Sequence, residues 1–433
     1  MIMPVPSLAA ALLLLSSFLI ARTADRRKAR GLAVRWVTAA AVPPGLAVLV
    51  GEGVPAGLPL PALHDAPQHA AGAAAEAAVI CAAGLPAVAM APLASHPPAT
   101  LARILRLLAV SCALAAVRHE AAVPALWAVA AWLVWSGMRP GGDLNVPPGL
   151  GRLFAVHHVP GVLLLGAGTA VAAAGAQETG AALAVLGIMV RLAVIPVHGW
   201  YPRLAEHAPM GVVVVFGTIP LEMLTRLQPL SGRLPVPVAH AVAVACGAAA
   251  LTAAALALVQ DRPRRALAFL AMSQTGLMAG GIVGRAPAVA AGLVPAWQVA
   301  ALALAGLAMA LAALEARRGA LSSAVPAGNL SRTPRLAVAF LLCGLAVAGF
   351  PFSLGFAAEH LLIRHSAEEF APSWPLLVAA VCLNAMTVMR CFLTLFAGGR
   401  GHRGERDLTP VETYGITVVL AALLIGVALP VSW

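Results

Sequence analysis

The sequence predicts an all-α integral membrane protein with about 14 transmembrane helices, two inverted five-helix repeats and two broken helices. Three observations predict this fold class. The 433 residues are 61% hydrophobic and 10% charged, which excludes an ordinary soluble globular protein. Apolar stretches long enough to cross a bilayer recur from end to end. Two of these stretches are interrupted by proline, near Pro196 and near Pro351, and each interruption adjoins charged residues.

Each predicted span is an apolar run of bilayer-crossing length, bounded by turns that contain Pro, Gly or charged residues. In chain order, the predicted spans cover residues 5–22, 31–53, 76–95, 101–118, 120–138, 154–175, 178–200, 209–228, 237–260, 264–284, 287–316, 335–365, 373–396 and 412–431. No basic residue precedes the first span and the basic cluster ADRRKAR follows it, so we expect a retained helix rather than a signal peptide. The loops have the lengths of linkers rather than of soluble domains.

The spans group into four regions. We expect N-terminal transmembrane helices at 1–100, a first repeat at 101–228, a second repeat at 237–396 and a last transmembrane helix at 412–433. The two repeats are suggested by the interruptions, because broken hydrophobic segments at matching places in two halves are typical of inverted repeats around a central ion or substrate site.

The net charge of +11 would suit a nucleic-acid partner, but the positions of the charges argue against one. Of the 28 Lys and Arg residues, 22 fall toward one side of the predicted spans, five fall toward the other, and Arg191 remains within a span. Arg226 is one of the five. This bias follows the positive-inside rule. We therefore predict a multi-pass protein of the inner (cytoplasmic) membrane, in contact with the lipid bilayer and with both termini on the outer side.

Three charged residues in apolar spans are the main candidates for an ion pathway. Arg191 lies just before Pro196, Glu222 lies well inside its span, and Glu359 directly follows the second interruption. Charges inside apolar helices are costly and are therefore often functional. Arg191 could instead snorkel to the inner membrane surface. A carboxylate such as Glu222 is too short to do so, which favours a functional or paired acid.

Histidine and cysteine supply weaker signals. His198 and His360 adjoin the two interruptions and are secondary candidates for the pathway. The pair His157-His158 has no partner at metal-ligand spacing, so we interpret it as interfacial. The six cysteines form no CxxC pair and are expected to be apolar packing residues. Loop 54–75 contains His and Asp, and a metal site there is less expected than a solvated loop. The sequence thus predicts no cofactor, no metal site and no catalytic site.

The segment from His198 to Pro202, HGWYP, resembles the proton-antiporter-type membrane subunits shared by respiratory complex I, membrane-bound hydrogenases and multisubunit cation/proton antiporters. Two other segments support this resemblance. QDRPRRALAFLAMSQTG (Gln260–Gly276) is similar to the loop and Ser-rich helix of the family, and GFPFSLGFAAEHLL (Gly349–Leu362) is similar to its broken twelfth helix. The resemblance covers roughly residues 100–396, and the first three spans match by hydropathy alone.

The resemblance places the ionisable residues of the family on particular positions of this chain. The helix-seven lysine falls on Arg191, the helix-eight lysine falls on Glu222, and the helix-twelve lysine or glutamate falls on Glu359. The helix-five glutamate falls on Ala128, which follows Trp127.

Several positions depart from the family pattern. The histidine and lysine of the eleventh helix fall near Gln298 and Leu302. A buried lysine can release its proton because burial lowers its pKa, whereas arginine stays protonated at any relevant pH. Arg191 can therefore steer a charge but cannot relay a proton. The one lysine of the chain, Lys28, lies in a loop, so a relay built on lysines is not available.

These residues predict an antiporter-like membrane subunit of a multisubunit ion- or redox-coupled complex, with altered or lost proton translocation. Arg191 could pair with Glu222, or with Glu120, as a compensating charge. The expected partners are other membrane subunits and a soluble redox or zinc-containing subunit. One alternative is a non-transporting scaffold that docks partner subunits, and another is the membrane subunit of an inorganic-carbon uptake complex. Any electron transfer would belong to a partner.

Overall fold

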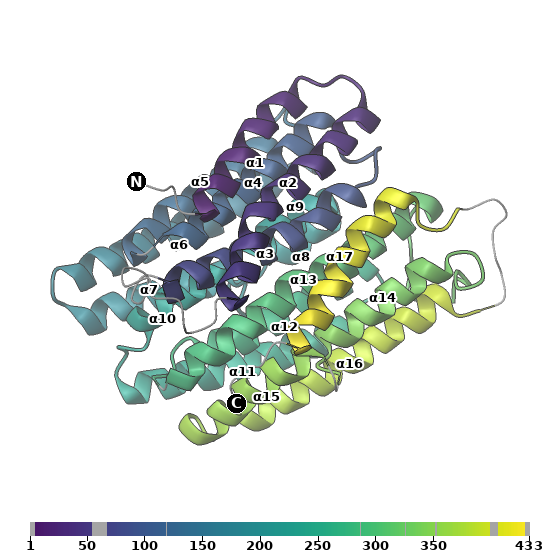
Figure 1. Ribbon diagram of the computed structural model, residues 1–433. Helices are drawn as coiled ribbons and strands as arrows, with labels where there is room; N and C mark the ends of the chain where they lie inside the picture. Colours follow the sequence, from purple (N-terminus) through teal and green to yellow (C-terminus); the bar gives the residue numbers. More distant parts are fainter. Residues whose placement is uncertain are drawn as a thin grey trace.

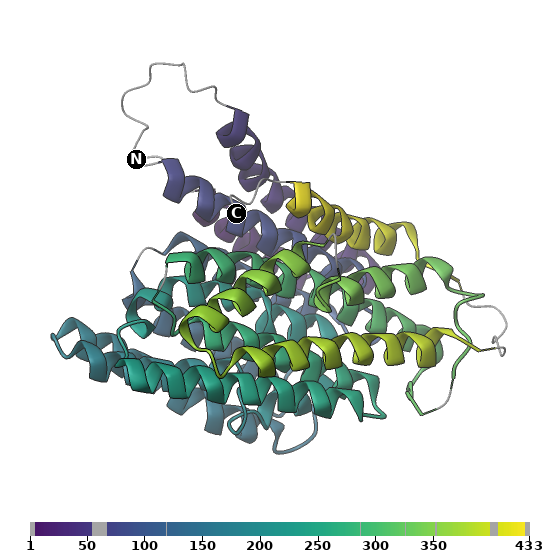
Figure 2. The ribbon, with the colours of Figure 1, turned by 90° about the horizontal axis from the view of Figure 1, so that it is seen from below.

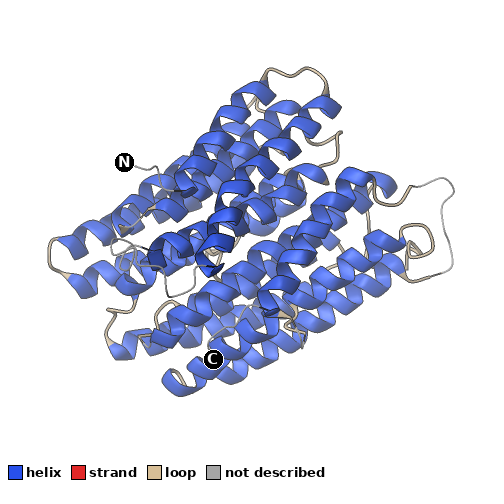
Figure 3. Ribbon diagram, in the orientation of Figure 1, coloured by secondary structure: helices blue, strands red, loops and turns tan. Residues whose placement is uncertain are grey.

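The computed structural model shows helices and no strands in the part of the chain that it describes (Figures 1 and 3). The described residues are 5–53, 67–117, 119–285, 287–324, 326–350, 353–398 and 406–428. Pro351 and most of loop 54–75 therefore lie outside them. The all-helical prediction is confirmed.

The described residues of the first half of the chain form ten α-helices and two short 3-10 turns. They are α1 (Val5–Ala21), α2 (Arg26–Gly53), α3 (Pro67–Ala89), α4 (Pro98–Ala116), η1 (Glu120–Ala122), α5 (Val123–Gly137), α6 (Leu150–Ala173), α7 (Gln177–Arg191), α8 (Trp200–His207), α9 (Met210–Gly217), η2 (Ile219–Glu222) and α10 (Met223–Ser231).

The second half forms longer helices on average. They are α11 (Val236–Leu258), α12 (Pro263–Gly281), α13 (Pro287–Arg318), α14 (Pro334–Val347), α15 (Leu354–Glu369), α16 (Trp374–Phe396) and α17 (Pro410–Ala428). The helices run largely side by side, with the purple and blue first half next to the green second half (Figure 1). Helix α13 packs against α3 and α9 of the first half and against α12, α14 and α15 of the second, so it lies at the centre of the bundle.

Among the described residues, nine helical segments are long and apolar enough to cross a membrane, and three shorter apolar helices accompany them. Several predicted spans are divided in the structure. The span at 178–200 ends as a helix at Arg191, the span at 209–228 becomes α9, η2 and α10, and the span at 335–365 becomes α14 and α15. The count of about 14 spans and the inverted repeats remain predictions.

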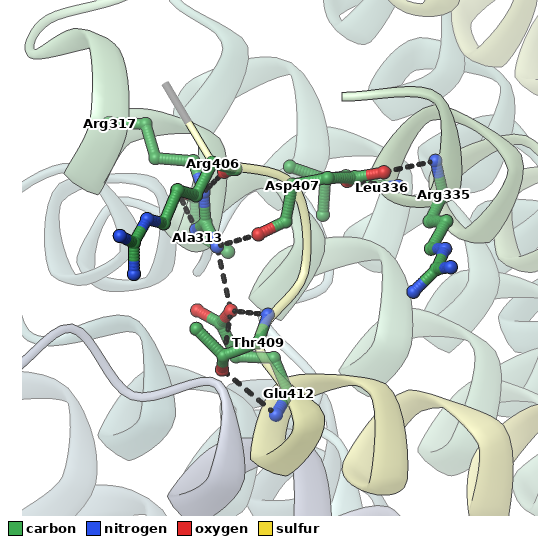
Figure 4. Close-up of polar contacts among 8 residues, drawn as sticks. All are labelled: Ala313, Arg317, Arg335, Leu336, Arg406, Asp407, Thr409 and Glu412. Carbon is green, nitrogen blue, oxygen red and sulfur yellow. Dashed lines mark hydrogen bonds and ion pairs between the residues drawn. The ribbon is translucent and has the colours of Figure 1, made fainter. Parts of the chain in front are cut away.

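The last helix, α17, returns to the N-terminal part of the chain and packs against α3 as well as α13. Figure 2 shows it in yellow at the border between the purple and green helices. Its start is fixed by Glu412, whose Oε2 accepts hydrogen bonds from Arg317 Nη2 at 2.6 Å and from Thr409 N at 2.8 Å (Figure 4). The neighbouring Asp407 accepts hydrogen bonds from the backbone N–H groups of Arg335 and Leu336, which are otherwise unpaired at the start of α14.

His96, in the turn between α3 and α4, fixes the start of α9. Its Nε2 accepts a hydrogen bond from the backbone N–H of Gly211 at 3.2 Å, so this contact requires an unprotonated Nε2. The pKa of His96 is lowered from 6.5 to about 4, mainly by burial. A hydrogen bond with the Pro92 carbonyl raises this pKa, and the nearby Arg264 lowers it, but both effects are smaller than that of burial.

We expect His96 to make the stability of the protein depend on pH. The unfolded histidine binds a proton near pH 6.5 and the folded one near pH 4. The contribution of His96 to the free energy of unfolding is therefore complete above about pH 6.5. It is lost progressively as the pH falls toward 4, by about 3 kcal/mol in total. The measurement is the melting temperature of the full chain in detergent between pH 7.5 and pH 4. His96→Gln, which keeps an acceptor but does not titrate, should remove this part of the pH dependence; an unchanged slope would contradict the assignment.

Candidate ion-handling site

Arg191, at the end of α7, lies inside the protein with only 2% of its surface exposed. Its Nη2 donates a hydrogen bond to the carbonyl oxygen of Phe216 at 2.5 Å, and its guanidinium carbon lies 4.6 Å from the centroid of the Phe216 ring. Nη1 has no hydrogen-bond partner within the described part of the chain. The side chain does not extend to the surface, so the snorkelling alternative is wrong.

The Phe216 carbonyl is free to accept this hydrogen bond because of the residue one helical turn later in the sequence. In a continuous α-helix the Phe216 carbonyl would accept a hydrogen bond from the N–H of residue 220. Residue 220 is a proline and has no N–H. The helix accordingly ends at Gly217, continues as the 3-10 turn η2, and leaves this carbonyl to Arg191.

The other two breaks follow the same rule. Pro196 frees the carbonyl of Leu192, which accepts a hydrogen bond from Thr275 Oγ1 at 2.8 Å. The Val347 carbonyl stands four residues before Pro351, and it accepts a hydrogen bond from Gln274 Nε2 at 2.9 Å. Consecutive residues of α12 thus satisfy the carbonyls at two breaks.

Glu359, on α15, is joined to this arrangement. Gln274 Nε2 also donates to Glu359 Oε1 at 3.2 Å, and the Glu359 side chain is 8% exposed. Its carboxylate lies over Gly349, which has φ +63°, and a Cβ at this position would collide with the carboxylate. Glycine is favoured at this break by its backbone conformation, and a larger residue would also displace the Glu359 carboxylate from this position. A small cavity of about 10 Å³, room for roughly one water molecule, adjoins Glu359 and Gln274.

Glu222 is fully buried in η2, and neither of its carboxylate oxygens has a hydrogen-bond partner among the described residues. The hypothesis of an Arg191–Glu222 ion pair is therefore not supported, because Arg191 bonds to a carbonyl instead. Glu120, the other suggested partner, lies half-buried in η1 and forms no ion pair or hydrogen bond with Arg191 within the described residues. Buried polar atoms without protein partners are usually satisfied by water.

The ion pair nearest to Glu222 in sequence joins Arg226 of α10 and Glu76 of α3. Arg226 Nη2 lies 2.6 Å from Glu76 Oε2, and the side chains are 14% and 13% exposed. Arg226 also donates hydrogen bonds to the carbonyls of Ala115, at 2.7 Å, and Val117, at 2.8 Å, at the end of α4. The ion pair and the two carbonyls hold Arg226 against α3 and the end of α4 instead of leaving it exposed.

An aromatic cluster packs against Phe216, the ring that Arg191 contacts. Trp127 Nε1 donates a hydrogen bond to His158 Nδ1 at 3.2 Å, and the His158 ring lies 4.4 Å from that of Trp200 and 5.2 Å from that of Phe216. His158 is 1% exposed, so the interfacial interpretation of this residue was wrong. The missed signal was helical spacing: His158 shares a face of α6 with the buried Phe154.

The remaining candidates lie away from these buried groups. His198 is half-buried, with Nδ1 3.2 Å from the Pro196 carbonyl oxygen, and His360 is exposed and stacks on Phe356. Ala128 and Leu302 supply no polar atom beyond the backbone. Over the ranges the structure describes, no group of three or more His, Cys, Asp or Glu side chains is arranged to hold a metal ion.

Apolar helices interrupted at buried charged residues define a multi-pass integral membrane protein with ionisable groups at its helix breaks. Residues 155–387 match the family described as NADH:quinone oxidoreductase/Mrp antiporter, TM. This match covers more than half of the chain, and the chain belongs to that family. The predicted resemblance is confirmed, and the chain is an antiporter-like membrane protein.

Relatives in sequence carry related names. The chain is 30% identical over 274 residues to NADH-quinone oxidoreductase subunit N of Deinococcus radiodurans. This alignment covers 60% of this chain and 54% of the relative. It is 27% identical over 346 residues to NADH-quinone oxidoreductase subunit 14 of Thermus thermophilus. That alignment covers 73% of this chain and 76% of the relative. The chain spans about half the length of several of its relatives, including 50% of subunit N of Beutenbergia cavernae.

Solved structures share the fold. A chain of the archaeal membrane-bound sulfane sulfur reductase superposes with a TM-score of 0.82 at 15% identity, over 98% of this chain and 76% of that one. A chain of respiratory complex I from Thermus thermophilus gives a TM-score of 0.80 at 19% identity, over 97% of this chain and 94% of that one. A chain of the Mrp complex from Dietzia gives a TM-score of 0.76 at 18% identity, over 99% of this chain and 93% of that one.

Proposed function

We propose that this protein is an antiporter-like membrane subunit of a multisubunit ion- or redox-coupled complex, in which proton translocation is altered from the family pattern. The observation that carries the proposal is Arg191. It occupies the helix-seven position of the family, is buried, and bonds to the Phe216 carbonyl. Because arginine does not release its proton, Arg191 acts as a fixed positive charge rather than as a relay.

The proposed pathway uses the two buried acids. Glu222 and Glu359 can each bind and release a proton, and the hydrogen bonds of α12 connect Glu359 to the first break through adjacent residues, Gln274 and Thr275. In this proposal the half-buried His198 and the exposed His360 lie at the ends of the pathway, where water has access.

The proposed setting follows from the comparisons and the charge distribution. The named relatives are subunits of NADH-quinone oxidoreductases, which supports other membrane subunits as partners. A soluble redox or zinc-containing subunit would supply the redox or metal chemistry, because the sequence of this chain contains no motif for either. The bias of 22 to five basic residues supports the cytoplasmic membrane, with both termini on the outer side.

Proton flux tests the proposal. We expect Glu359→Gln to lower proton flux at least about tenfold in proteoliposomes that contain the complex, because an amide cannot exchange a proton and tenfold corresponds to about 1.4 kcal/mol of barrier. Glu178→Gln is the matched control, since Glu178 is an exposed acid in the first turn of α7. Equal flux in the native and Glu359→Gln complexes would exclude transport through Glu359.

One observation favours the alternative of a scaffold without transport. The stretch of α13 from Val299 to Leu314, at the centre of the bundle, contains only Ala, Val, Leu, Gly and Met. The resemblance places ionisable residues of the family near Gln298 and Leu302. A complex whose native flux equals that of empty liposomes, but which fails to assemble without this chain, would support the scaffold.

A further inference from the structure

The outer surface of α5 and α6 carries two connected hollows that belong to neither the site nor its breaks. The first, of about 780 Å³, lies where the turn after α5 meets the start of α6, and Arg139 and Arg152 line it. The second is an apolar groove of about 330 Å³ between the two helices, lined by residues that include Trp132 and Leu163. Trp135 and Ala155 line both hollows, so the two are continuous.

The first hollow is positively charged. Arg139 and Arg152 are exposed, and neither forms an ion pair with any other described residue. The guanidinium carbon of Arg139 lies 5.2 Å from the centroid of the Trp135 ring, which holds the charge at the edge of the apolar groove.

The nearest acid in sequence does not neutralise these arginines. Asp143 is the one acid between Glu120 and Glu178. Its Oδ1 accepts a hydrogen bond from Arg103 Nε at 3.1 Å, and its Oδ2 accepts one from Thr100 Oγ1 at 3.0 Å. These bonds also fix the turn against α4.

The second hollow faces the lipid. Its lining residues Trp132 and Leu163 are 59% and 65% exposed, and both lie in segments long and apolar enough to cross the membrane. The hollows therefore present, in order along the membrane normal, two unpaired cations at the end of the spans and an apolar groove inside the bilayer. This order matches a phosphate headgroup followed by an acyl chain.

We infer that the α5–α6 surface is a binding site for an anionic phospholipid, with the phosphate between Arg139 and Arg152 and one acyl chain in the groove. Charge complementarity and the continuity of the two hollows favour a lipid over a protein partner. The inference does not depend on whether the chain conducts protons.

Native mass spectrometry of the full chain in detergent tests the site, with phosphatidylglycerol and phosphatidylcholine as the probes. We expect the chain to retain phosphatidylglycerol in preference to phosphatidylcholine. Arg139→Gln and Arg152→Gln should each weaken phosphatidylglycerol binding about fivefold. Arg203→Gln, which changes another exposed arginine outside the hollow, should have no effect.

A second pair of variants tests the groove. Ala155→Trp fills the junction of the hollows and should abolish retention, whereas Ala170→Trp, at an exposed alanine farther along α6, should not. Equal retention of both lipids, or retention unaffected by Ala155→Trp, would overturn the inference. So would loss of a partner subunit from the Arg139→Gln complex while lipid binding stays native, because the surface would then be a protein interface.

Discussion

Replacing Arg226 by methionine is expected to lower the free energy of unfolding by about 3–5 kcal/mol. The change leaves the Glu76 carboxylate, 13% exposed, without its partner at 2.6 Å. It also removes two hydrogen bonds from the end of α4, at the carbonyls of Ala115 and Val117. Arg226 therefore connects α3, α4 and α10, and its loss affects all three. Denaturant unfolding of the full chain in detergent measures the effect.

A double-mutant cycle separates the ion pair from the carbonyl bonds. Glu76→Gln alone leaves Arg226 with its two carbonyls, so we expect a smaller loss than for Arg226→Met. The double variant should recover part of the loss, because no unpaired buried charge remains. Arg364→Met is the control: Arg364 pairs with Glu368 at 3.0 Å, but the side chains are 65% and 57% exposed, and such pairs contribute about 0–1 kcal/mol. Equal losses at positions 226 and 364 would show that burial of the pair has no energetic effect.

The sequence predicted the features that depend on local composition. Apolar runs located the helices, since hydropathy is summed over neighbouring residues. The break at Pro196 was recognised from its proline and the polar residues after it. The break at Pro220 was missed, because this proline stands in an uninterrupted apolar run and changes α9 to a 3-10 turn instead of ending the span. The carbonyl four residues before each proline lacks its helical N–H donor and is the group that needs another partner.

The pairing of side chains could not be read from the sequence, because it depends on which helices pack together. Arg226 and Glu76 are separated by 150 positions, and Gln274 and Val347 by 73. Proximity in sequence suggested that Arg191 would pair with Glu222, whereas packing brought it to a carbonyl. Ionisable residues in apolar spans are evident from the sequence, whereas their partners depend on the tertiary structure.

Replacing Arg191 by methionine is expected to leave the free energy of unfolding within about 1 kcal/mol of the native value. Two effects oppose each other. The Phe216 carbonyl would lose its donor, at a cost of about 1–3 kcal/mol, and the cation–π contact would be lost as well. Against this, removal of a buried cation without a carboxylate partner restores about 1–4 kcal/mol of desolvation penalty. Arg226→Met differs from this variant, because removing Arg226 leaves the carboxylate of Glu76 buried without a partner. Removing Arg191 leaves no unpaired carboxylate of this kind.

The activity of Arg191→Met should nevertheless fall at least about tenfold in the proton-flux assay, since the variant lacks the fixed charge of the proposed pathway. A loss of flux without a loss of stability identifies the charge as functional, because a misfolded chain would lose both. The opposite result, native flux with stability lowered by about 1–3 kcal/mol, would mean that Arg191 serves only to satisfy the carbonyl freed by Pro220. Pro220→Ala in the Arg191→Met background distinguishes these roles further. It supplies the missing N–H to the Phe216 carbonyl and should raise the stability of the Arg191→Met chain, but it cannot restore flux if the positive charge is what the pathway requires.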